Sequence, residues 1–187
     1  IIEAIKDNQD IDKVLLLKSS RSSLTKSLID LIIKNNISYS FVPIQRFDRL
    51  KTKNHQGALA FLSPIKLINI EELIDNSLEK NGNPTFILLD GITDVRNFGA
   101  IIRTAVATNV AGIIISQSNS APINSDVVKT SAGTLFNMPI CKVNNLKDAI
   151  MHLKASNIEI ISLTEKAEKS IYERVLNKPI AIILGSE

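Results

Sequence analysis

Five short apolar runs in the second part of the chain constrain its fold more than any other feature. Each run is rich in Ile, Leu or Val and is bounded by turn residues; the runs are TFILLD, AGIIIS, MPICKV, EIISLT and IAIILG. Helix patterns separate most of them, namely FGAIIRTAVATN, SDVVKTSAGTLF, LKDAIMHLKASN and a weaker EKSIYERVL. Apolar strands that alternate with helices are typical of a parallel sheet with helices on both faces. We therefore predict an α/β domain over residues 66–187.

A smaller α/β pattern occupies residues 1–65. A helix end is predicted at IIEAIK, strands at VLLLKS, SYSFVP and ALAFLS, and an amphipathic helix at SSLTKSLIDLIIKNN. The stretch RFDRLKTKNHQG is polar and basic, and a further helix after residue 68 ends at the breaker run NGNP. We place the boundary between two domains near residue 65.

Charge is distributed unevenly between these two parts. Residues 1–66 contain 11 Lys/Arg and 6 Asp/Glu, whereas residues 67–187 contain 11 and 13. A basic first domain on a slightly acidic second domain suggests a polyanionic partner, although scatter of this size is also common in ordinary proteins.

Composition excludes several classes of protein. Hydrophobic residues make up 44% and charged residues 22%, as in soluble globular proteins. No apolar run approaches the ~18 residues of a membrane span. The single cysteine, Cys141, excludes an internal disulfide, and with only His55 and His152 beside it we expect no metal site. We expect a cytoplasmic protein that needs no membrane and no metal.

The most informative stretch is DGITDVRNFGAIIRTA, at residues 90–105, where a polar loop joins a strand to a helix. Ligands of parallel sheets bind at the carboxyl ends of the strands, which is where this loop lies. The chain has no G-x-G-x-x-G, no G-x-x-x-x-G-K-[ST] and no G-x-S-x-G, so dinucleotide, NTPase and serine hydrolase sites are poorly supported.

NFGAIIRTA resembles the first signature of the SpoU, or TrmH, family of RNA ribose 2′-O-methyltransferases. The matching residues are Asn97, Gly99, Arg103, Thr104 and Ala105. IAIILGSE resembles the start of the second signature, through Leu184, Gly185 and Glu187. Residues 1–65 are similar to the family's substrate-binding domain, in IIEAIK, KVLLLK and HQGALA. The resemblance is closest to the bacterial branch that methylates a guanosine of 23S ribosomal RNA.

The resemblance implies a SPOUT-type fold with a trefoil knot, S-adenosylmethionine as cofactor, RNA as substrate and a homodimer packed through the catalytic domains. The third signature, with its L-N-x-S-x-A-like run, does not occur in this chain. The knot segment is therefore missing, and we expect a fragment of a longer protein whose cofactor site is incomplete as it stands.

Candidate roles follow from the signatures. Catalytic roles are predicted for Asn97, Arg103 and Glu187, and cofactor contacts for Thr164, Leu184 and Gly185. Because arginine is effectively always protonated, we favour Arg103 as a positioning group for the ribose or its phosphate over a general base. Asn97 is expected just before the helix, where it caps the helix or orients the site, or both. RNA contacts are predicted for Arg46, Arg49, Lys51, Lys53 and His55, with Phe47 stacking between them.

Two alternatives remain open at this point. One is a transfer-RNA ribose methyltransferase, against which the extra first domain argues mildly. The other is an RNA-binding protein that keeps the scaffold without catalysis.

Overall fold

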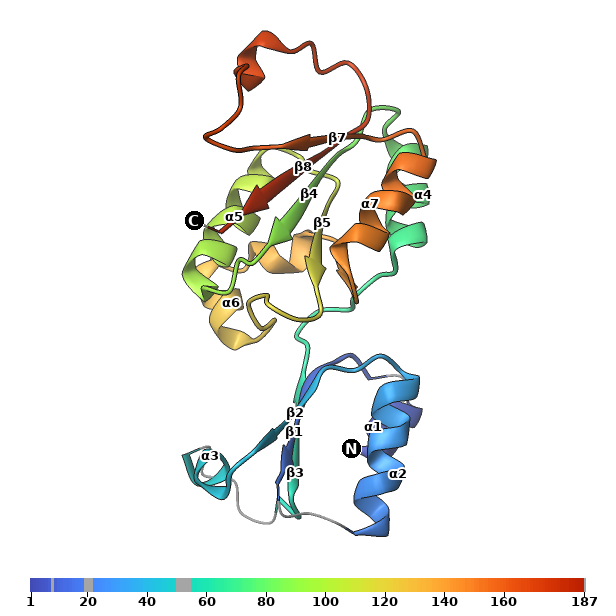
Figure 1. Cartoon of the computed structure of the whole chain (residues 1–187), viewed down its shortest axis with the longest axis vertical. Helices are drawn as coiled ribbons and strands as arrows, with labels where there is room; N and C mark the ends of the chain where they lie inside the picture. The colour runs from blue at the N-terminus through green and yellow to red at the C-terminus, as the bar shows by residue number, and fades with distance from the viewer. Residues whose placement is uncertain (8, 19–21, 50–54, 187) are drawn as a thin grey trace. The chain divides into compact units, whose positions relative to one another are not determined.

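The computed structural model describes residues 1–7, 9–18, 22–49 and 55–186, and consists of two compact units (Figure 1). The first unit is Ile1–Pro64 and the second is Ile65–Glu187. The division after Pro64 lies beside the sequence boundary at residue 65. Both units combine helices with a sheet, but the two sheets differ in composition and in how they are covered.

The first unit is built on a three-stranded mixed sheet in the order β2-β1-β3. Its strands are β1 (Ile11–Leu17), β2 (Tyr39–Val42) and β3 (Ala58–Leu62). β2 runs parallel to β1, whereas β3 runs antiparallel to it. Its helices are α1 (Ile2–Lys6), α2 (Ser23–Lys34) and α3 (Ile44–Arg49). Figure 1 shows α1 and α2 on one side of this sheet and α3 on the other.

The core of the first unit forms on the side of α1 and α2. Val14 and Leu16 of β1 are two residues apart and so point to the same face, where they pack with Leu28 and Ile32 of α2. All four side chains are buried. α2 begins at the N-cap Ser22, whose hydroxyl accepts a hydrogen bond from the backbone N–H of Thr25 at 3.1 Å.

The second unit contains a five-stranded sheet in the order β6-β5-β4-β8-β7. Its strands are β4 (Thr85–Asp90), β5 (Gly112–Ser116), β6 (Ile140–Val143), β7 (Glu159–Ser162) and β8 (Ile180–Gly185). Every neighbouring pair is parallel. All five apolar runs of the sequence thus form strands of one parallel sheet, and the predicted α/β fold class is confirmed.

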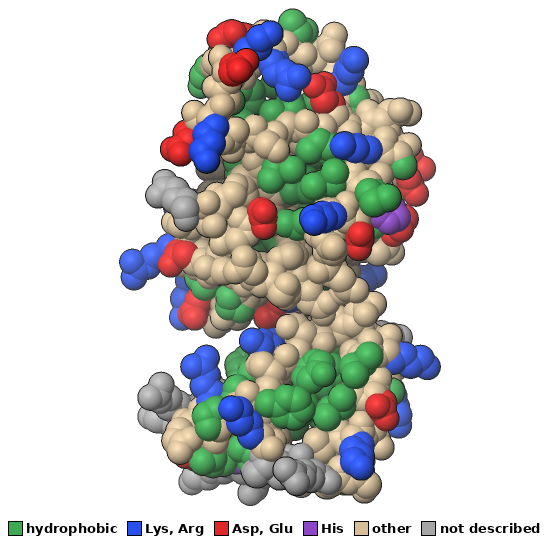
Figure 2. All heavy atoms as spheres, in the orientation of Figure 1, with side chains coloured by type: hydrophobic (Ala, Val, Ile, Leu, Met, Phe, Trp, Pro, Cys, Tyr) green, Lys and Arg blue, Asp and Glu red, His purple; other side chains and the backbone are tan. Residues whose placement is uncertain are grey.

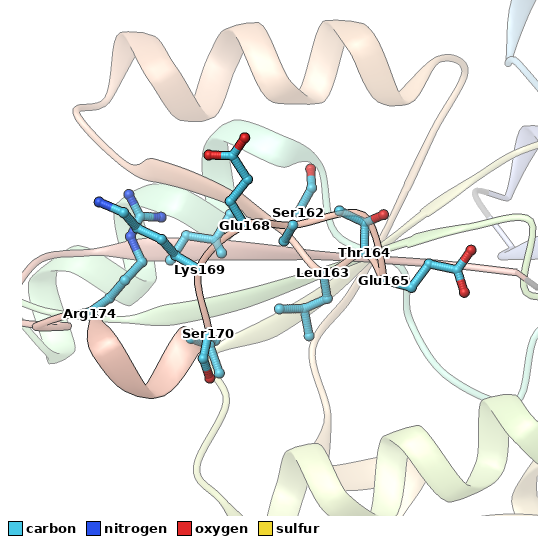
Figure 3. Close-up of a pocket in the computed structure, with 11 residues that line it drawn as sticks. Ser162, Leu163, Thr164, Glu165, Glu168, Lys169, Ser170 and Arg174 are labelled. Carbon is cyan, nitrogen blue, oxygen red and sulfur yellow. The ribbon is translucent and has the colours of Figure 1, made fainter.

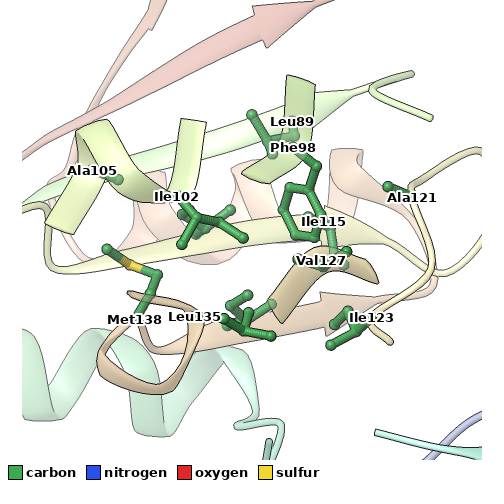
Figure 4. Packing of buried hydrophobic residues seen from close by; sticks show 12 residues of the cluster. Leu89, Phe98, Ile102, Ala105, Ile115, Ala121, Ile123, Val127, Leu135 and Met138 are labelled. Atoms are coloured by element: carbon green, nitrogen blue, oxygen red, sulfur yellow. The ribbon is translucent and has the colours of Figure 1, made fainter. Parts of the chain in front are cut away.

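Helices cover both faces of this sheet (Figure 1). The elements are α4 (Ile70–Lys80), α5 (Val95–Ala107), α6 (Ser125–Thr130), the 3-10 helix η1 (Thr134–Asn137) and α7 (Leu146–Ala155). α4 and α7 bury Leu73, Ile74 and Leu153 with one face. α5, α6 and η1 bury the other, as the packed side chains of Figure 4 show. Phe98, Ile102 and Ala105 of α5 recur at helical spacing and are all buried.

Gly99 sets the close approach of α5 to α6. A Cβ at this position would lie 2.3 Å from Oγ1 of Thr130 and 2.7 Å from its backbone carbonyl carbon. The Thr130 hydroxyl also donates to the backbone oxygen of Val95 at 3.0 Å. Gly99 of the first signature therefore serves helix packing directly.

Two helix patterns differ from their predictions. SDVVKTSAGTLF is interrupted because Ala132 and Gly133 have φ of 52° and 80°, outside the helical range, so η1 follows α6 as a separate turn. EKSIYERVL forms only the short 3-10 helix η2 (Ile171–Glu173). Tyr172 is 95% exposed, so this segment has no packed face to stabilise a longer helix.

α3 was not predicted from the sequence. Its stretch has only Ile44 and Phe47 as large apolar residues, too few for a recognisable helical stripe. Phe47 is fully buried and holds the helix against its unit.

Within the described residues, no helix combines the length and apolar character that crossing a bilayer requires. The same part of the chain contains no group of three or more His, Cys, Asp or Glu side chains arranged to hold a metal ion.

Candidate active site

The ends of β4 and β8 lie side by side in the second unit. Asp90 and Gly185, the last residues of these strands, are paired in the parallel register. The backbone N–H of Ser186 donates to the backbone oxygen of Asp90 at 3.0 Å. The strand that precedes the first signature and the strand that carries the second thus end side by side at one edge of the sheet, at the spacing of neighbouring strands.

A third loop joins them at Gly91. This glycine has a φ of 74°, and a Cβ there would lie 2.9 Å from Oγ of Ser186 and 3.4 Å from Nδ2 of Asn119. Asn119 belongs to the loop after β5, which is tied back by a 2.8 Å hydrogen bond from the N–H of Ala121 to the oxygen of Ile92. The loops after β4, β5 and β8 therefore converge on a position that excludes a side chain.

The loop after β5 was missed in the sequence. Its polar run QSNS follows AGIIIS directly, and the carboxyl ends of parallel strands share an edge. That position alone could have nominated Asn119, although no motif marks it.

α5 begins directly from this convergence, and Asp94 caps it. The Asp94 carboxylate accepts from the backbone N–H groups of Arg96 at 2.7 Å and Asn97 at 3.0 Å. These hydrogen bonds, that of Asn97 first, hold the pKa of the Asp94 carboxyl below its usual value of 3.8. The expectation that Asn97 precedes the helix and caps it is wrong, because Asn97 lies in the first turn of α5 and is exposed.

Arg103 lies two turns further along α5 and is exposed. Among the residues that the structure describes, no carboxylate forms an ion pair with it. Arg103 is six positions after Asn97, which places the two side chains about 120° apart around the helix axis. Arg96, seven residues before Arg103, lies on the same stripe and was not singled out from the sequence.

The predicted cofactor residues lie at the ends of β8 and β7. β7 pairs with β8, and the N–H of Leu163 donates to the oxygen of Ile183 at 3.1 Å, which brings Thr164 beside the end of β8. The side chain of Leu184 packs partly into the α5 core, so its backbone is the part that faces the edge. Gly185 is exposed, and a Cβ added there would meet no atom within 4 Å.

An open pocket of about 920 Å³ lies beside β7 and the loop that follows it (Figure 3). It is lined by the strand end, which includes Thr164, and by the loop that returns to β8. Figure 3 shows Thr164 and Glu165 at the strand end, with Lys169 and Arg174 further along the loop. Arg174 is anchored to Glu159 of β7 by a 3.1 Å ion pair.

Of the five predicted RNA-binding residues of the first unit, the structure describes the side chains of two, Arg46 and His55. Arg46 is exposed on α3. His55 is half-buried: its Nδ1 accepts from the N–H of Gly57 at 3.0 Å, and its ring packs on Phe47 with centroids 4.5 Å apart. Because Phe47 is fully buried, the expectation that it stacks on a nucleotide base is wrong. Figure 2 shows Lys and Arg side chains spread over the visible face of this unit, with few acids among them.

Several predicted residues fall outside the described part of the chain. Lys51, Lys53 and Glu187 lie outside it, and for Arg49 only the backbone, at the end of α3, is described. Their roles stay predictions.

Comparison with protein families gives two matches that together cover almost the whole chain. Residues 84–187 match the SpoU rRNA Methylase family. Residues 1–67 match the RNA 2′-O ribose methyltransferase substrate binding family. The first match contains the convergent loops and α5, and the second spans the mixed sheet.

The curated relatives of this chain are named as RNA methyltransferases. The chain is 28% identical, over its whole length and 75% of the relative's, to the putative TrmH family tRNA/rRNA methyltransferase YacO of Bacillus subtilis. It is 36% identical to the 23S rRNA (guanosine-2′-O-)-methyltransferase RlmB of Vibrio vulnificus, over 75% of this chain and 56% of that protein. The chain thus spans about half to three quarters of the length of these relatives.

Solved structures share the fold. An rRNA methyltransferase of Sinorhizobium meliloti, solved with AdoMet, superposes with a TM-score of 0.55 at 19% identity over 97% of this chain and 66% of that one. The SpoU methyltransferase AviRb of Streptomyces viridochromogenes, also in complex with AdoMet, gives 0.54 at 16% identity, over 97% and 68%. With the family match across more than half of the chain, these findings place the protein in the SpoU rRNA methylase family of RNA 2′-O-ribose methyltransferases.

Proposed function

We propose that the intact protein transfers a methyl group from S-adenosylmethionine to the 2′-hydroxyl of a ribose in RNA, and that this ribose belongs to a guanosine of 23S ribosomal RNA. The observation that carries the proposal is the contact between the ends of β4 and β8, where Ser186 N–H binds the Asp90 oxygen at 3.0 Å. It brings the loop that leads to Arg103 and the strand end at Gly185 to one edge of the sheet. The choice of a 23S RNA guanosine as the substrate is based on the RlmB relative, which is 36% identical to this chain.

Methyl transfer to a ribose hydroxyl requires above all that the hydroxyl be held in the correct position. S-adenosylmethionine supplies a methyl group already activated by the sulfonium charge, so the protein's task is to align the hydroxyl and manage its proton. Arg103 is the group suited to hold the phosphate or ribose oxygen, because its guanidinium is exposed and unpaired within the described residues. Asn97 and Glu187 are proposed to orient the nucleotide or Arg103 beside it.

The residues at the strand ends fit the cofactor. The open space around Gly185 leaves room for an adenosine group against the backbone. Leu184 and Thr164 lie at the same edge, since β7 pairs with β8 and the N–H of Leu163 donates to the oxygen of Ile183. The neighbouring pocket of about 920 Å³ falls within the range of small-molecule sites, so a ligand of this size can be accommodated.

The first unit is proposed to bind the RNA through its basic residues, with Arg46, Arg49, Lys51, Lys53 and His55 as the predicted contacts. Its sequence matches the substrate-binding family over residues 1–67. A homodimer packed through the second unit is part of the same proposal and rests on the family resemblance. Light scattering of the purified protein measures its oligomeric state directly.

Labelled-methyl transfer tests the function. The intact protein is incubated with ribosomal RNA and S-adenosylmethionine carrying a labelled methyl group, and modified riboses are mapped by their resistance to alkaline cleavage. We expect Arg103→Ala to lower transfer roughly 100-fold or more while cofactor affinity stays within a few-fold. Lys147→Ala, an exposed cation on α7, serves as the matched control and keeps wild-type transfer.

Each rival predicts a different result in that experiment. Methylation of transfer RNA instead of 23S RNA would favour the transfer-RNA assignment, which the tRNA/rRNA name of the YacO relative keeps open. RNA binding without any methyl transfer by the wild-type protein would establish a non-catalytic binder. Wild-type transfer by Arg103→Ala would remove Arg103 from the mechanism.

A further inference from the structure

The face of the first unit's sheet opposite α1 and α2 carries polar and aromatic side chains. Side chains alternate along β1, so Lys13 and Leu15 point away from the core that Val14 and Leu16 build with α2. Ser40 of β2 pairs with Leu15 in the parallel register and therefore lies on the same face. Of the helices that the structure describes in this unit, α3 alone lies on this side of the sheet (Figure 1).

A pocket of about 470 Å³ opens on this face, where the sheet meets α3. Its lining comes from β1, from β2 and from the start of α3; the residues are Lys13, Leu15, Ser40, Val42, Pro43, Gln45 and Arg46. The lining thus combines two cations, a hydroxyl and an amide with apolar side chains, and contains no acid among the described residues. This donor set is suited to an anion with several oxygen atoms.

No carboxylate of the described residues forms an ion pair with either cation. Some cations of the chain have carboxylate partners, such as Lys6 with Glu3 at 3.0 Å and Arg174 with Glu159 at 3.1 Å. Within the described residues, Lys13 and Arg46 form no such pair. Two uncompensated cations that line one pocket raise the local potential and favour a bound anion.

An exposed aromatic ring lies beside the pocket. Phe61 of β3 is the antiparallel partner of Lys13, so the two side chains are neighbours on the open face. Phe61 is 37% exposed. Phe41, by contrast, pairs with Leu16 and therefore lies on the opposite face, where its ring packs edge-on against Tyr39 at 5.9 Å.

We propose that this face is a nucleotide-binding site for single-stranded RNA, in which Lys13 and Arg46 hold one backbone phosphate and Phe61 stacks on the adjacent base. The proposal rests on the proposed RNA methylation, since it names where the substrate is held. Phosphate contact beside an aromatic platform is the common arrangement for single strands, because every base presents a stacking surface. This proposal adds Lys13 and Phe61 to the predicted RNA-binding residues. Phe61 takes the stacking role that the sequence analysis gave to Phe47, which is buried.

Binding of a fluorescein-labelled single-stranded oligoribonucleotide to the intact protein, measured by anisotropy over a salt series, tests the site. We expect Lys13→Gln and Arg46→Gln each to weaken binding about five-fold near 0.1 M salt and to reduce the salt slope by about 0.7. Phe61→Leu should weaken binding about five-fold or more with an unchanged slope. The matched controls are Lys26→Gln on α2 and Phe41→Leu on β2, which change the same residue types on the side of the sheet opposite the pocket.

Losses confined to the pocket variants, with both controls near wild type, support the site. Equal losses in Lys13→Gln and Lys26→Gln would show that only the overall charge matters and would overturn it. Methyl transfer by the same preparations separates this inference from the proposed function. Wild-type transfer with RNA binding that is indifferent to Lys13 and Phe61 defeats the pocket alone, whereas pocket-dependent binding without any methyl transfer defeats the catalytic proposal alone.

Discussion

The two units differ in where a ligand can reach the sheet. The five-stranded sheet of the second unit has helices on both faces, and its strands are continuous apolar runs. Polar groups can therefore gather only at the strand ends, as Asp90, Gly91 and Ser186 do. The mixed sheet of the first unit has one covered face and one partly open face, where Lys13 and Phe61 lie side by side.

The two sheets therefore offer a ligand two different surfaces, the strand ends in the second unit and an open sheet face in the first. Parallel strands buried on both faces give a rigid frame whose loops can vary, which suits the precise alignment of a reaction. A half-covered sheet presents a regular array of side chains, which suits contact with an extended polymer. This difference supports our proposals of chemistry at an edge of the second unit's sheet and of RNA binding on a face of the first.

Thiol accessibility gives the largest expected contrast between the two sheets. Cys141 of β6 is fully buried, and this burial, with a smaller effect of the Glu71 carboxylate, raises its pKa to about 12. At pH 8 only about one thiol in 10⁴ would be ionised, so the native wild-type protein should not react with Ellman's reagent. Ser40→Cys on the open face of the first unit should release one equivalent of the chromophore rapidly.

Denaturant provides the control for that experiment, since unfolding exposes Cys141 and should restore its reaction. Rapid reaction of native wild-type protein would mean that the second sheet is not covered as described. A Ser40→Cys variant that does not react with Ellman's reagent would mean that the first sheet has no open face.

Gly99→Ala should destabilise the second unit selectively. The added Cβ would lie within 3 Å of the side chain and backbone of Thr130, so α5 and α6 must separate, at a cost of about 1–3 kcal/mol. Hydrogen exchange reports each unit separately, and faster exchange is expected in β4 and β5 but not in β1. Gly82→Ala is the matched control, because a Cβ there meets nothing. Equal exchange in both variants would contradict the close packing of α5 on α6.

Acid titration gives the smallest effect. The folded pKa of Asp94 lies below its unfolded value, so its charge stabilises the protein above the unfolded pKa, and this stabilisation is lost as pH falls through the folded pKa. Asp94→Asn keeps an oxygen acceptor without the charge, so wild type should have the higher Tm at pH 6. The difference should shrink below pH ~4. A difference that does not depend on pH would exclude the charged cap.

The sequence predicts the strands of the second unit well, because their apolar runs are long and separated by clear helix patterns. It predicts less where burial depends on distant contacts. EKSIYERVL has helical spacing, yet Tyr172 and Val175 remain exposed because the segment packs on nothing. Conversely, α3 lacks an apolar stripe and is held by the burial of Phe47.

Sequence patterns also predict only part of the candidate site. The two signatures point to the ends of β4 and β8, and these strand ends do meet, at Asp90 and Gly185; the roles of Arg103 and Gly185 stay predictions. It does not find Asn119, which enters only because β5 is next to β4 in the sheet. The sequence suggested Asn97 as the cap of α5, whereas the structure has Asp94 in this position. Both are good capping residues, and only the backbone geometry of the turn decides between them.

Binding of S-adenosylmethionine to Gly185→Ala, measured by calorimetry on the intact protein beside Gly82→Ala, tests most directly whether the strand ends form the cofactor site. A Cβ at either glycine meets no atom within 4 Å, so both variants should keep the stability of wild type. Gly185→Ala should lose about ten-fold or more in affinity, because the methyl group would occupy the space proposed for the adenosine, while Gly82→Ala binds normally. Wild-type affinity in a stably folded Gly185→Ala protein would contradict the account.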